Sequence, residues 1–413
     1  MNYFEDLNTK LVGLVGSKEG AISPTITSSA SFAYGTPETA EGIFDGSVKK
    51  PLYSRMGNPT TAKLESIIAE IEGGVGAIAT SSGMGATSLV CMSLLSSGDE
   101  IISIGGLFGG TYALFSETLS RFGIKTHFFD VDELEAIKSA VNEKTKIIFL
   151  ESVGNPNMRL PDIKAIADIA NESEIALVVD NTATPLSLSA LKMGADIVVY
   201  STTKLISGNA SALGGCAVFR AIENEYDKFK TPRYSDIHKF IKGAGAMALI
   251  ANGKKRALRD FGMSANAHAS YQTMLGLETL ALRVERITKS VEIVAKELKS
   301  HGLKVNHPSL ASHPHYERYM SDFIRGCGPL LTIDFGSKEA AFSFLRNTKL
   351  ATLTANIGDS RTLALHMAST IYRDFDNPTR EFLGITEGLV RVSIGLESPH
   401  DIVSDFLAAS KAE

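Results

Sequence analysis

Two apolar runs near the middle of the chain each end at a side chain that can do chemistry. Ile175–Val179 leads into Asp180, and the run through Val198–Tyr200 leads into Ser-Thr-Thr-Lys204. In a sheet of parallel strands, the side chains at the carboxyl ends of the strands converge on one crevice. An acid and a lysine that are separated by one strand–helix–strand unit can therefore face the same ligand.

Pyridoxal phosphate requires such a pair. Its aldehyde takes a lysine amine as a Schiff base, and a carboxylate holds its ring nitrogen protonated, so that the ring withdraws electrons. Considered alone, Asp180 and Lys204 are equally consistent with two ordinary loops, because strands often end in polar residues.

Neighbouring residues add the features of a phosphate site. Ser201 and Thr203 carry hydroxyl groups just before Lys204, and the glycine-containing segment Ser81–Thr87 precedes the apolar, helix-like stretch Ser88–Leu95. Backbone N–H groups and the helix dipole at such a helix start favour an anion. A glycine-rich turn is a weak signal by itself, but together with the acid and the lysine it becomes moderately specific.

The composition is that of an ordinary globular protein. The 413 residues are 44% hydrophobic and 21% charged, with a formal net charge of −5, which provides no basic field for nucleic acid. Three widely spaced cysteines predict neither a disulfide framework nor a metal site. No basic leader and no apolar run of membrane-spanning length is present, so we expect a cytoplasmic protein that does not enter a membrane.

The order of the patterns predicts an α/β domain with a mainly parallel sheet, followed by a smaller α+β domain. Residues 1–60, which are rich in Ser, Thr, Gly and Pro, are expected to form an extended arm. Residues 61–255 are expected to form the large domain and residues 256–413 the small one, with a long helical stretch through Leu275–Arg283. Within the large domain we predict a helix over Pro161–Ala170 with the proline in its first turn, a helix over Ala62–Ile71, and strands over 100–104, 146–150, 176–179 and 196–199. In the small domain we predict strands near 330–334 and 389–394.

Several motifs, in order along nearly the whole chain, resemble the Cys/Met-metabolism family of pyridoxal-phosphate enzymes. They are Tyr53–Thr60, Ser82–Ala86, Glu151–Pro156, Asp180–Thr182, Ser201–Lys204 and Val390–Glu397. The resemblance implies fold type I of the aspartate aminotransferase class. Within the family, Gly276–Leu280 and Ala355–Asp359 resemble O-acetylhomoserine sulfhydrylases more than cystathionine synthases or lyases, and methionine γ-lyases are the nearest competitor.

The resemblance also implies the roles of individual residues. Lys204 would carry the cofactor and Asp180 would pair with its ring nitrogen. The remaining cofactor contacts would be Gly83, Met84, Ser201 and Thr203 at the phosphate, Phe108 at the ring, and Tyr53 and Arg55 reaching the phosphate from a neighbouring subunit. Thr182 would also bind the cofactor. Asn155, Asn356 and Arg391 would bind the substrate. Shared sites of this kind require a homodimer or homotetramer, and the sequence does not separate the two.

The implied reaction is γ-replacement in methionine biosynthesis, in which O-acetylhomoserine and sulfide give homocysteine and acetate. Whether the acyl group is acetyl or succinyl stays open. The alternatives are γ-elimination or replacement of the methionine γ-lyase or cystathionine γ-synthase and lyase types. A protein that binds pyridoxal phosphate without catalysis is a different class of function, and the joint presence of Lys204, Asp180 and Arg391 argues against it.

The chain also departs from the family pattern. Phe108 stands where tyrosine is usual, which keeps ring stacking but removes the phenol, and we do not assume that Tyr112 replaces it. Family members often carry histidine at the positions of Tyr200 and Asn209, and end in Thr-His where this chain has His366–Tyr372. We interpret these changes as lying near the substrate, and hypothesise a sulfur donor other than free sulfide alone, such as a sulfur-carrier protein.

Overall fold

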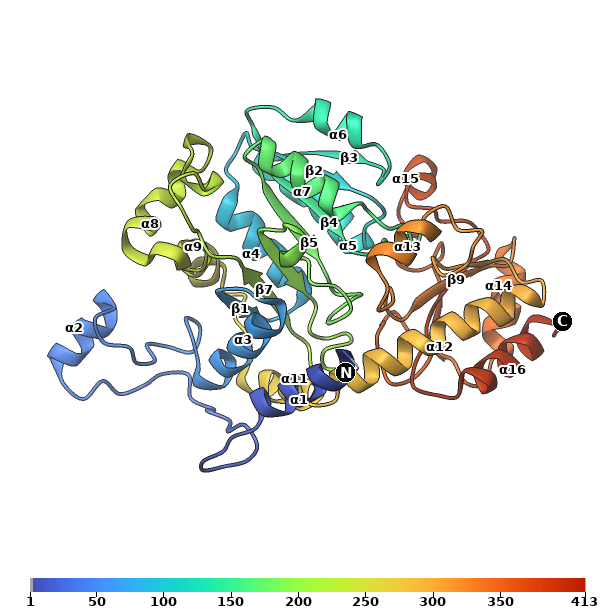
Figure 1. Cartoon of the computed structure of the whole chain (residues 1–413), viewed down its shortest axis with the longest axis horizontal. Helices are drawn as coiled ribbons and strands as arrows, with labels where there is room; N and C mark the ends of the chain where they lie inside the picture. Colours follow the sequence, from blue (N-terminus) through green and yellow to red (C-terminus); the bar gives the residue numbers. More distant parts are fainter. Residues whose placement is uncertain (1–2, 413) are drawn as a thin grey trace.

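The computed structural model describes residues 3–412 and builds them around two β-sheets (Figure 1). The larger sheet has seven strands in the order β1-β7-β6-β5-β4-β2-β3. Its strands are β1 (Gly76–Thr80), β2 (Glu100–Ile104), β3 (Lys125–Phe129), β4 (Thr145–Glu151), β5 (Ala176–Asp180), β6 (Ile197–Tyr200) and β7 (Gly215–Phe219). Neighbours from β3 to β6 are parallel, and β7 is antiparallel to both β6 and β1. The predicted α/β class is confirmed.

Helices cover both faces of this sheet, and its central strands β5 and β6 are apolar runs that are buried on both sides. The helices are α3 (Pro59–Glu72), α4 (Gly83–Leu94), α5 (Gly109–Ala113), α6 (Leu134–Ala140), α7 (Ile163–Glu172), α8 (His238–Ala244), α9 (Ala248–Gly253), α10 (Arg259–Phe261) and α11 (Ala267–Leu277). The predicted buried face of α7 is confirmed at Ile163, Ile166, Ala167 and Ala170. Its start is two residues later than predicted, because the Asp162 side chain accepts from the Ala165 N–H and caps the helix.

The smaller domain has a five-stranded sheet in the order β10-β11-β12-β9-β8. Its strands are β8 (Val305–Asn306), β9 (Leu330–Asp334), β10 (Thr352–Leu353), β11 (Leu363–His366) and β12 (Leu389–Ser393). Its helices are α12 (Leu280–Ser300), α13 (Tyr316–Asp322), α14 (Lys338–Asn347), α15 (Asn377–Phe382) and α16 (Pro399–Ser410). The long helical stretch predicted from residue 255 is interrupted at Gly262, where the chain takes a φ of 70° and ends α10.

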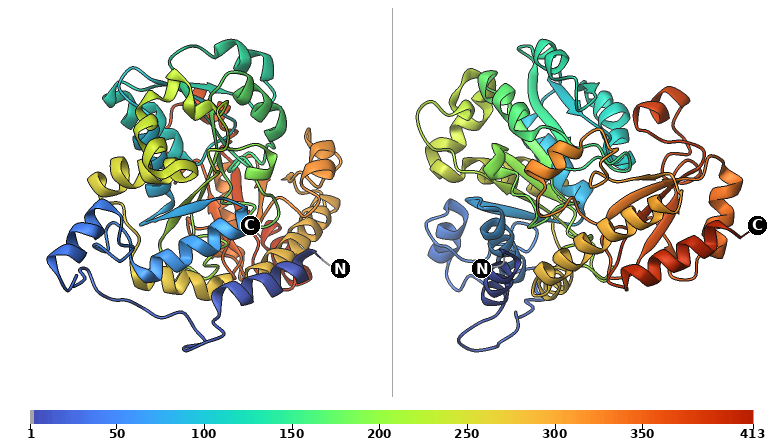
Figure 2. Two further views of the ribbon diagram at one scale, coloured as in Figure 1. Left: turned by 60° about the vertical axis from the view of Figure 1, so that its left-hand side comes forward. Right: turned by 45° about the vertical axis from the view of Figure 1, so that its right-hand side comes forward.

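The N-terminal segment differs from the predicted extended arm. Two helices interrupt it, α1 (Tyr3–Val15) and α2 (Pro37–Asp45). Leu11 and Val15 of α1 are buried, and α1 packs against α11 and α12. Apolar residues at helical spacing, from Phe4 through Leu7 and Leu11 to Leu14, account for this contact. The rest of the segment extends away from the body in both views of Figure 2. Residues 1, 2 and 413 of the predicted ranges lie outside the described part.

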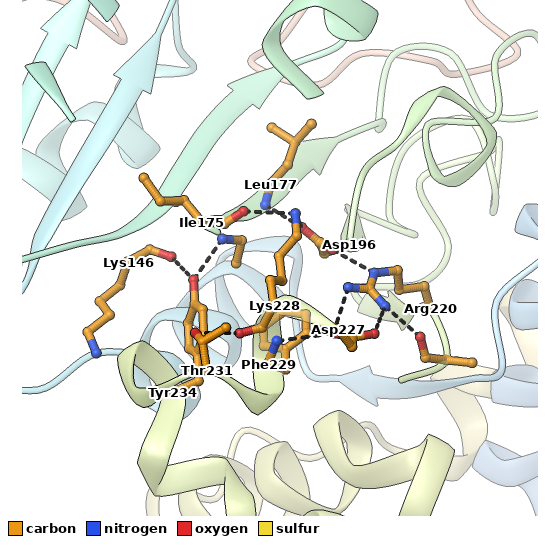
Figure 3. A network of polar contacts seen from close by, with 12 residues as sticks. Lys146, Ile175, Leu177, Asp196, Arg220, Asp227, Lys228, Phe229, Thr231 and Tyr234 are labelled. Carbon is orange, nitrogen blue, oxygen red and sulfur yellow. Dashed lines mark hydrogen bonds and ion pairs between the residues drawn. The ribbon is translucent and has the colours of Figure 1, made fainter. Parts of the chain in front are cut away.

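A polar network closes the amino ends of β4, β5 and β6 (Figure 3). The buried Asp196 carboxylate accepts from Arg220 Nε at 2.6 Å and from Lys228 Nζ at 3.0 Å. The Tyr234 hydroxyl donates to the Lys146 carbonyl at 2.5 Å and accepts from the Ala176 N–H at 2.7 Å. This network holds the strands at the end of the sheet opposite to Asp180 and Lys204. Across residues 3–412, no helix combines the length and the apolarity needed to span a membrane.

Candidate active site

A cavity of about 210 Å³ lies at the carboxyl ends of β4, β5 and β6, between the start of α4 and the smaller sheet. Its wall brings together most of the predicted site residues, namely Gly83, Met84, Phe108, Asn155, Asp180, Thr182, Ser201, Thr203, Lys204 and Arg391. Residues from both domains therefore share one cavity, and the small domain contributes its residues from β9, β12 and the loop after β10.

Lys204 follows β6 and is held by a residue of the small domain. Its Nζ donates to Asn356 Oδ1 at 2.7 Å. Burial and, to a smaller extent, the nearby positive charge of Arg391 together lower the pKa of Lys204 to about 8. A substantial fraction of this amine is therefore neutral near pH 7 to 8, and the neutral amine is the form that acts as a nucleophile or a base. Asn356 itself contacts Lys204 rather than forming part of the cavity wall.

Two carboxyl groups lie side by side at the ends of β4 and β5. Asp180 is opposite Glu151 in the parallel register, and the Thr182 N–H donates to Asp180 Oδ1 at 2.9 Å. Burial raises the pKa of Asp180, and burial together with the negative charge of Asp180 raises the pKa of Glu151 well above its usual range. A cationic ring nitrogen beside Asp180 would supply the opposite charge that favours its ionised form.

Glu151 was assigned no role in the sequence analysis. Its Oε1 accepts from the Phe108 N–H at 2.7 Å, and its side chain lines the cavity. The criterion that identified Asp180 could have found it, since Glu151 also ends an apolar run in a predicted parallel strand.

The start of α4 supplies the anion-binding end of the cavity. Ser82 caps this helix by accepting from the Gly85 N–H at 3.0 Å, and the first N–H groups of a helix lack intrahelical partners. A Cβ on Gly83 would lie 2.6 Å from Ser201 Cβ, so glycine is required for this close approach. The Thr203 hydroxyl lines the cavity and exchanges hydrogen bonds with the backbone of Gly214.

The opposite end of the cavity carries a buried guanidinium. Arg391, on β12, donates through NH1 to Asn155 Oδ1 at 3.0 Å. Burial lowers the pKa of Arg391 to about 10, so it stays charged at neutral pH. A guanidinium beside a side-chain amide suits a carboxylate, which accepts hydrogen bonds from both groups.

Other predicted residues lie outside this cavity. Tyr53 and Arg55 contact each other, with the guanidinium carbon 5.7 Å from the ring centre, and Arg55 donates to the Arg259 carbonyl. Within one chain, these two residues do not line the cavity.

Two of the family departures also lie away from the cavity. The Tyr200 hydroxyl donates to the buried Glu72 carboxylate and accepts from Asn181 Nδ2, which is behind the site, and the Asn209 side chain accepts from Ser211. Our interpretation that these changes lie on the substrate side is wrong for the Tyr200 side chain, and Asn209 does not line the cavity within one chain.

The residues present fit pyridoxal phosphate. The cavity has hydroxyls and a helix start at one end, a lysine of lowered pKa beside them, an acid deeper in the sheet, and the aromatic ring of Phe108 in its wall. Gly83, Met84, Ser201 and Thr203 would hold the phosphate, and Asp180 would hold the ring nitrogen.

Comparison with known proteins gives a consistent result. Residues 9–411 match the family described as Cys/Met metabolism PLP-dependent enzyme. The chain is 34% identical to an O-acetyl-L-homoserine sulfhydrylase from Leptospira meyeri, covering 97% of this chain and 96% of the relative. It is also 34% identical to an L-methionine gamma-lyase from Fusobacterium nucleatum, with 95% and 94% covered.

A solved structure from Campylobacter jejuni, which bears the name O-acetylhomoserine (thiol)-lyase and contains a pyridoxyl-lysine phosphate, superposes with a TM-score of 0.91. That structure is 31% identical in sequence and covers 98% of this chain and 100% of its own. A match over nearly the whole length, together with a cavity that fits the cofactor, assigns this chain to the Cys/Met-metabolism family of pyridoxal-phosphate-dependent enzymes.

Proposed function

We propose that the enzyme catalyses γ-replacement on O-acetyl-L-homoserine, forming L-homocysteine and acetate with sulfide as the sulfur donor. The observation that carries the proposal is the composition of one cavity. It contains a lysine that can move protons, a guanidinium–amide pair suited to a carboxylate, and a ring-stacking residue, Phe108, that has no hydroxyl. The sulfhydrylase names of relatives across nearly the full length support the same activity.

The residues of this chain have separate tasks in the proposed reaction. Arg391 and Asn155 bind the α-carboxylate and fix the orientation of the amino acid. Lys204, neutral in part because of its lowered pKa, takes the α-proton and later returns a proton to the product. Asn356 accepts a hydrogen bond from the Lys204 amine, and we assign it the task of holding this amine beside the substrate. When bound, pyridoxal phosphate supplies an electron sink for the proton removals.

The bond changes balance with sulfide as the second substrate. The C–O bond at the γ-carbon breaks and acetate leaves with the electron pair, and a C–S bond forms at the same carbon. Acetate is a far better leaving group than hydroxide, which explains the use of an activated homoserine ester.

Methionine γ-lyase activity is the second candidate, and an equally similar relative with that name favours it. The test is product formation by the cofactor-loaded protein from O-acetylhomoserine with and without sulfide, measuring homocysteine and 2-oxobutanoate separately. We expect homocysteine only when sulfide is present. Dominant 2-oxobutanoate would contradict the proposal and support γ-elimination, and no turnover would support a binding protein. Running O-succinylhomoserine in parallel identifies the acyl group.

The hypothesis that a carrier protein delivers the sulfur can be tested separately. A steady-state assay with free sulfide tests it, and full turnover at low sulfide would overturn it.

We further propose that the arm supplies Tyr53 and Arg55 to the cavity of a neighbouring copy. Their position outside the cavity of their own chain supports this assignment.

A further inference from the structure

Tyr372 is the largest side chain in the described structure that is completely buried, and no role has been given to it above. It belongs to the small domain, in the loop between β11 and α15, and packs in an apolar cluster with Met367, Leu383 and Leu389. It stands where family members end a motif in histidine, so its contacts are a property of this chain.

The Tyr372 hydroxyl reaches out of this cluster to the backbone of the large domain. It donates to the Asn155 carbonyl at 3.0 Å and lies 3.4 Å from the Leu107 carbonyl. The phenol oxygen therefore contacts the residue before Phe108 and the residue that holds Arg391.

The surrounding packing leaves the phenol little freedom. A Cβ on Gly109 would lie 3.0 Å from Ile371 Cγ2 and 3.2 Å from Tyr372 Cε1. The Tyr372 ring meets Phe375 edge-on at 5.6 Å, and Phe375 contacts Tyr112, which follows Gly109 on α5. The small domain thus holds the Tyr372 ring while the large domain holds its hydroxyl, so this side chain can couple the relative position of the two domains to the cavity.

We propose that Tyr372 is a positioning residue. Its hydroxyl aligns the Asn155–Arg391 pair with the Phe108 ring, so that the amino-acid carboxylate and the cofactor ring are held in the correct relative orientation. The inference rests on the proposed function only in that an amino acid binds at Arg391. It holds for γ-replacement and γ-elimination alike.

The test compares the cofactor-loaded wild type with Tyr372→Phe, which keeps the ring and removes the hydroxyl. Leaving buried carbonyl groups without a donor typically costs enough to weaken binding by about tenfold. We expect the KM for O-acetylhomoserine to rise by about tenfold, with the KM for sulfide unchanged. The affinity for norvaline, which has the same carboxylate and no leaving group, should fall equally in a titration of the cofactor absorbance. The visible circular dichroism of the cofactor should change, because Phe108 shifts.

Two further variants separate positioning from stability. Tyr234→Phe removes a similarly buried hydroxyl with two backbone partners at the far end of the sheet, and should lower thermal stability without changing either KM. Gly109→Ala crowds Tyr372 without removing its hydroxyl, and should raise the KM for the amino acid in the same direction as Tyr372→Phe.

Equal changes in both KM values, or an unchanged norvaline affinity in Tyr372→Phe, would overturn the inference. A circular dichroism spectrum of Tyr372→Phe identical to that of the wild type would overturn the claim that Tyr372 positions the Phe108 ring. A wild type that binds norvaline but makes no homocysteine would instead contradict the proposed function alone.

Discussion

Lys204 is buried beside a guanidinium, and this setting determines when its amine can react. The protonated amine loses hydration on burial and is repelled by Arg391, so the neutral form predominates above a pKa of about 8. Both causes act in the same direction, and only the neutral amine can attack an aldehyde.

The rate at which the cofactor-free protein binds pyridoxal phosphate covalently should therefore follow this titration. We expect the rate to rise about tenfold per pH unit below about pH 8 and to level off above it. Arg391→Ala should move the midpoint to higher pH, because it removes the repulsion and admits water, whereas Arg391→Lys keeps the positive charge and should keep the midpoint low. Trapping the adduct by reduction at a series of pH values measures the rate. An Arg391→Ala midpoint at the wild-type pH would refute the explanation.

Phe108 is the residue that we connect with the choice between replacement and elimination. Phe108→Tyr restores a phenol in the cavity wall, and a positioned acid–base group commonly contributes a hundredfold or more. We expect the ratio of 2-oxobutanoate to homocysteine to rise by about tenfold or more. Phe108→Leu, which adds no hydroxyl, serves as the control and should not raise the ratio. The ratio is measured by quantifying both products from one reaction. An unchanged ratio in Phe108→Tyr would show that Phe108 does not determine the choice between replacement and elimination.

At the scale of elements, the two ends of the central strands differ: the carboxyl ends carry the site residues, and the amino ends carry a polar network that connects the strands. The carboxyl ends of β5 and β6 carry Asp180 and Lys204, whereas the amino ends are closed by the Asp196 network (Figure 3). Asp196 is 1% exposed and pairs with two cations. Burial lowers the pKa of Lys228, and the charge of Asp196 counteracts this shift.

Asp196→Asn should therefore destabilise the fold without changing the chemistry. Removing one partner of a buried ion pair leaves the other charge uncompensated and costs about 3 to 5 kcal/mol. We expect a clearly lower midpoint of thermal unfolding, with kcat unchanged below the transition. Glu172→Gln, which breaks the exposed pair with Lys138, is the matched control and should change stability by about 1 kcal/mol or less. Equal midpoints for the two variants would show that the network is not stabilising.

The success of prediction from sequence also differs between elements. Strands β2, β4, β5 and β6 were predictable because each is a short, largely buried apolar run. Strands β1, β3 and β7 were not predicted, and β3 is only partly buried and begins with Lys-Thr-His. Helix α1 was missed because its apolar positions lie next to a long stretch of small and polar residues, which dominated the composition of that segment.

Within the site, the residues at strand ends could be predicted from the apolar runs that precede them. Contacts between the two domains could not be predicted in this way. The bond from Lys204 to Asn356 joins residues 152 positions apart, and the one from Tyr372 to Asn155 spans 217 positions. Neither spacing has a local periodicity, so only tertiary structure reveals these bonds. The family resemblance supplied the Arg391 and Asn356 assignments, and it did not indicate the position of Tyr372.

At the scale of the whole molecule, the projecting arm is the feature on which the proposed second copy depends. Arm side chains such as Ile22 and Phe44 are 80% and 71% exposed in the single chain. A cavity completed by Tyr53 and Arg55 of another copy would be inactive in a monomer.

Mixing two inactive variants tests this arrangement. Lys204→Ala and Arg55→Ala should each lose most activity, and a refolded equimolar mixture should recover about a quarter of the wild-type rate, since half of the dimers then contain one intact site. A mixture of Lys204→Ala with Asp180→Ala, both in the cavity wall, is the control and should recover almost none. Failure of the first mixture to exceed the second would mean that Arg55 acts within its own chain.

The division of the cavity between the two domains also sets the order in which the site is made during synthesis. Every cavity residue contributed by the large domain precedes residue 214, whereas Leu330, Ala355, Ile357 and Arg391 follow much later. Because domains fold as units from the N-terminus during translation, a nascent chain presents the lysine and the acid of the cofactor side while the carboxylate-binding arginine has yet to be translated. The side of the cavity that fits the cofactor is thus translated before the side that we propose holds the amino acid.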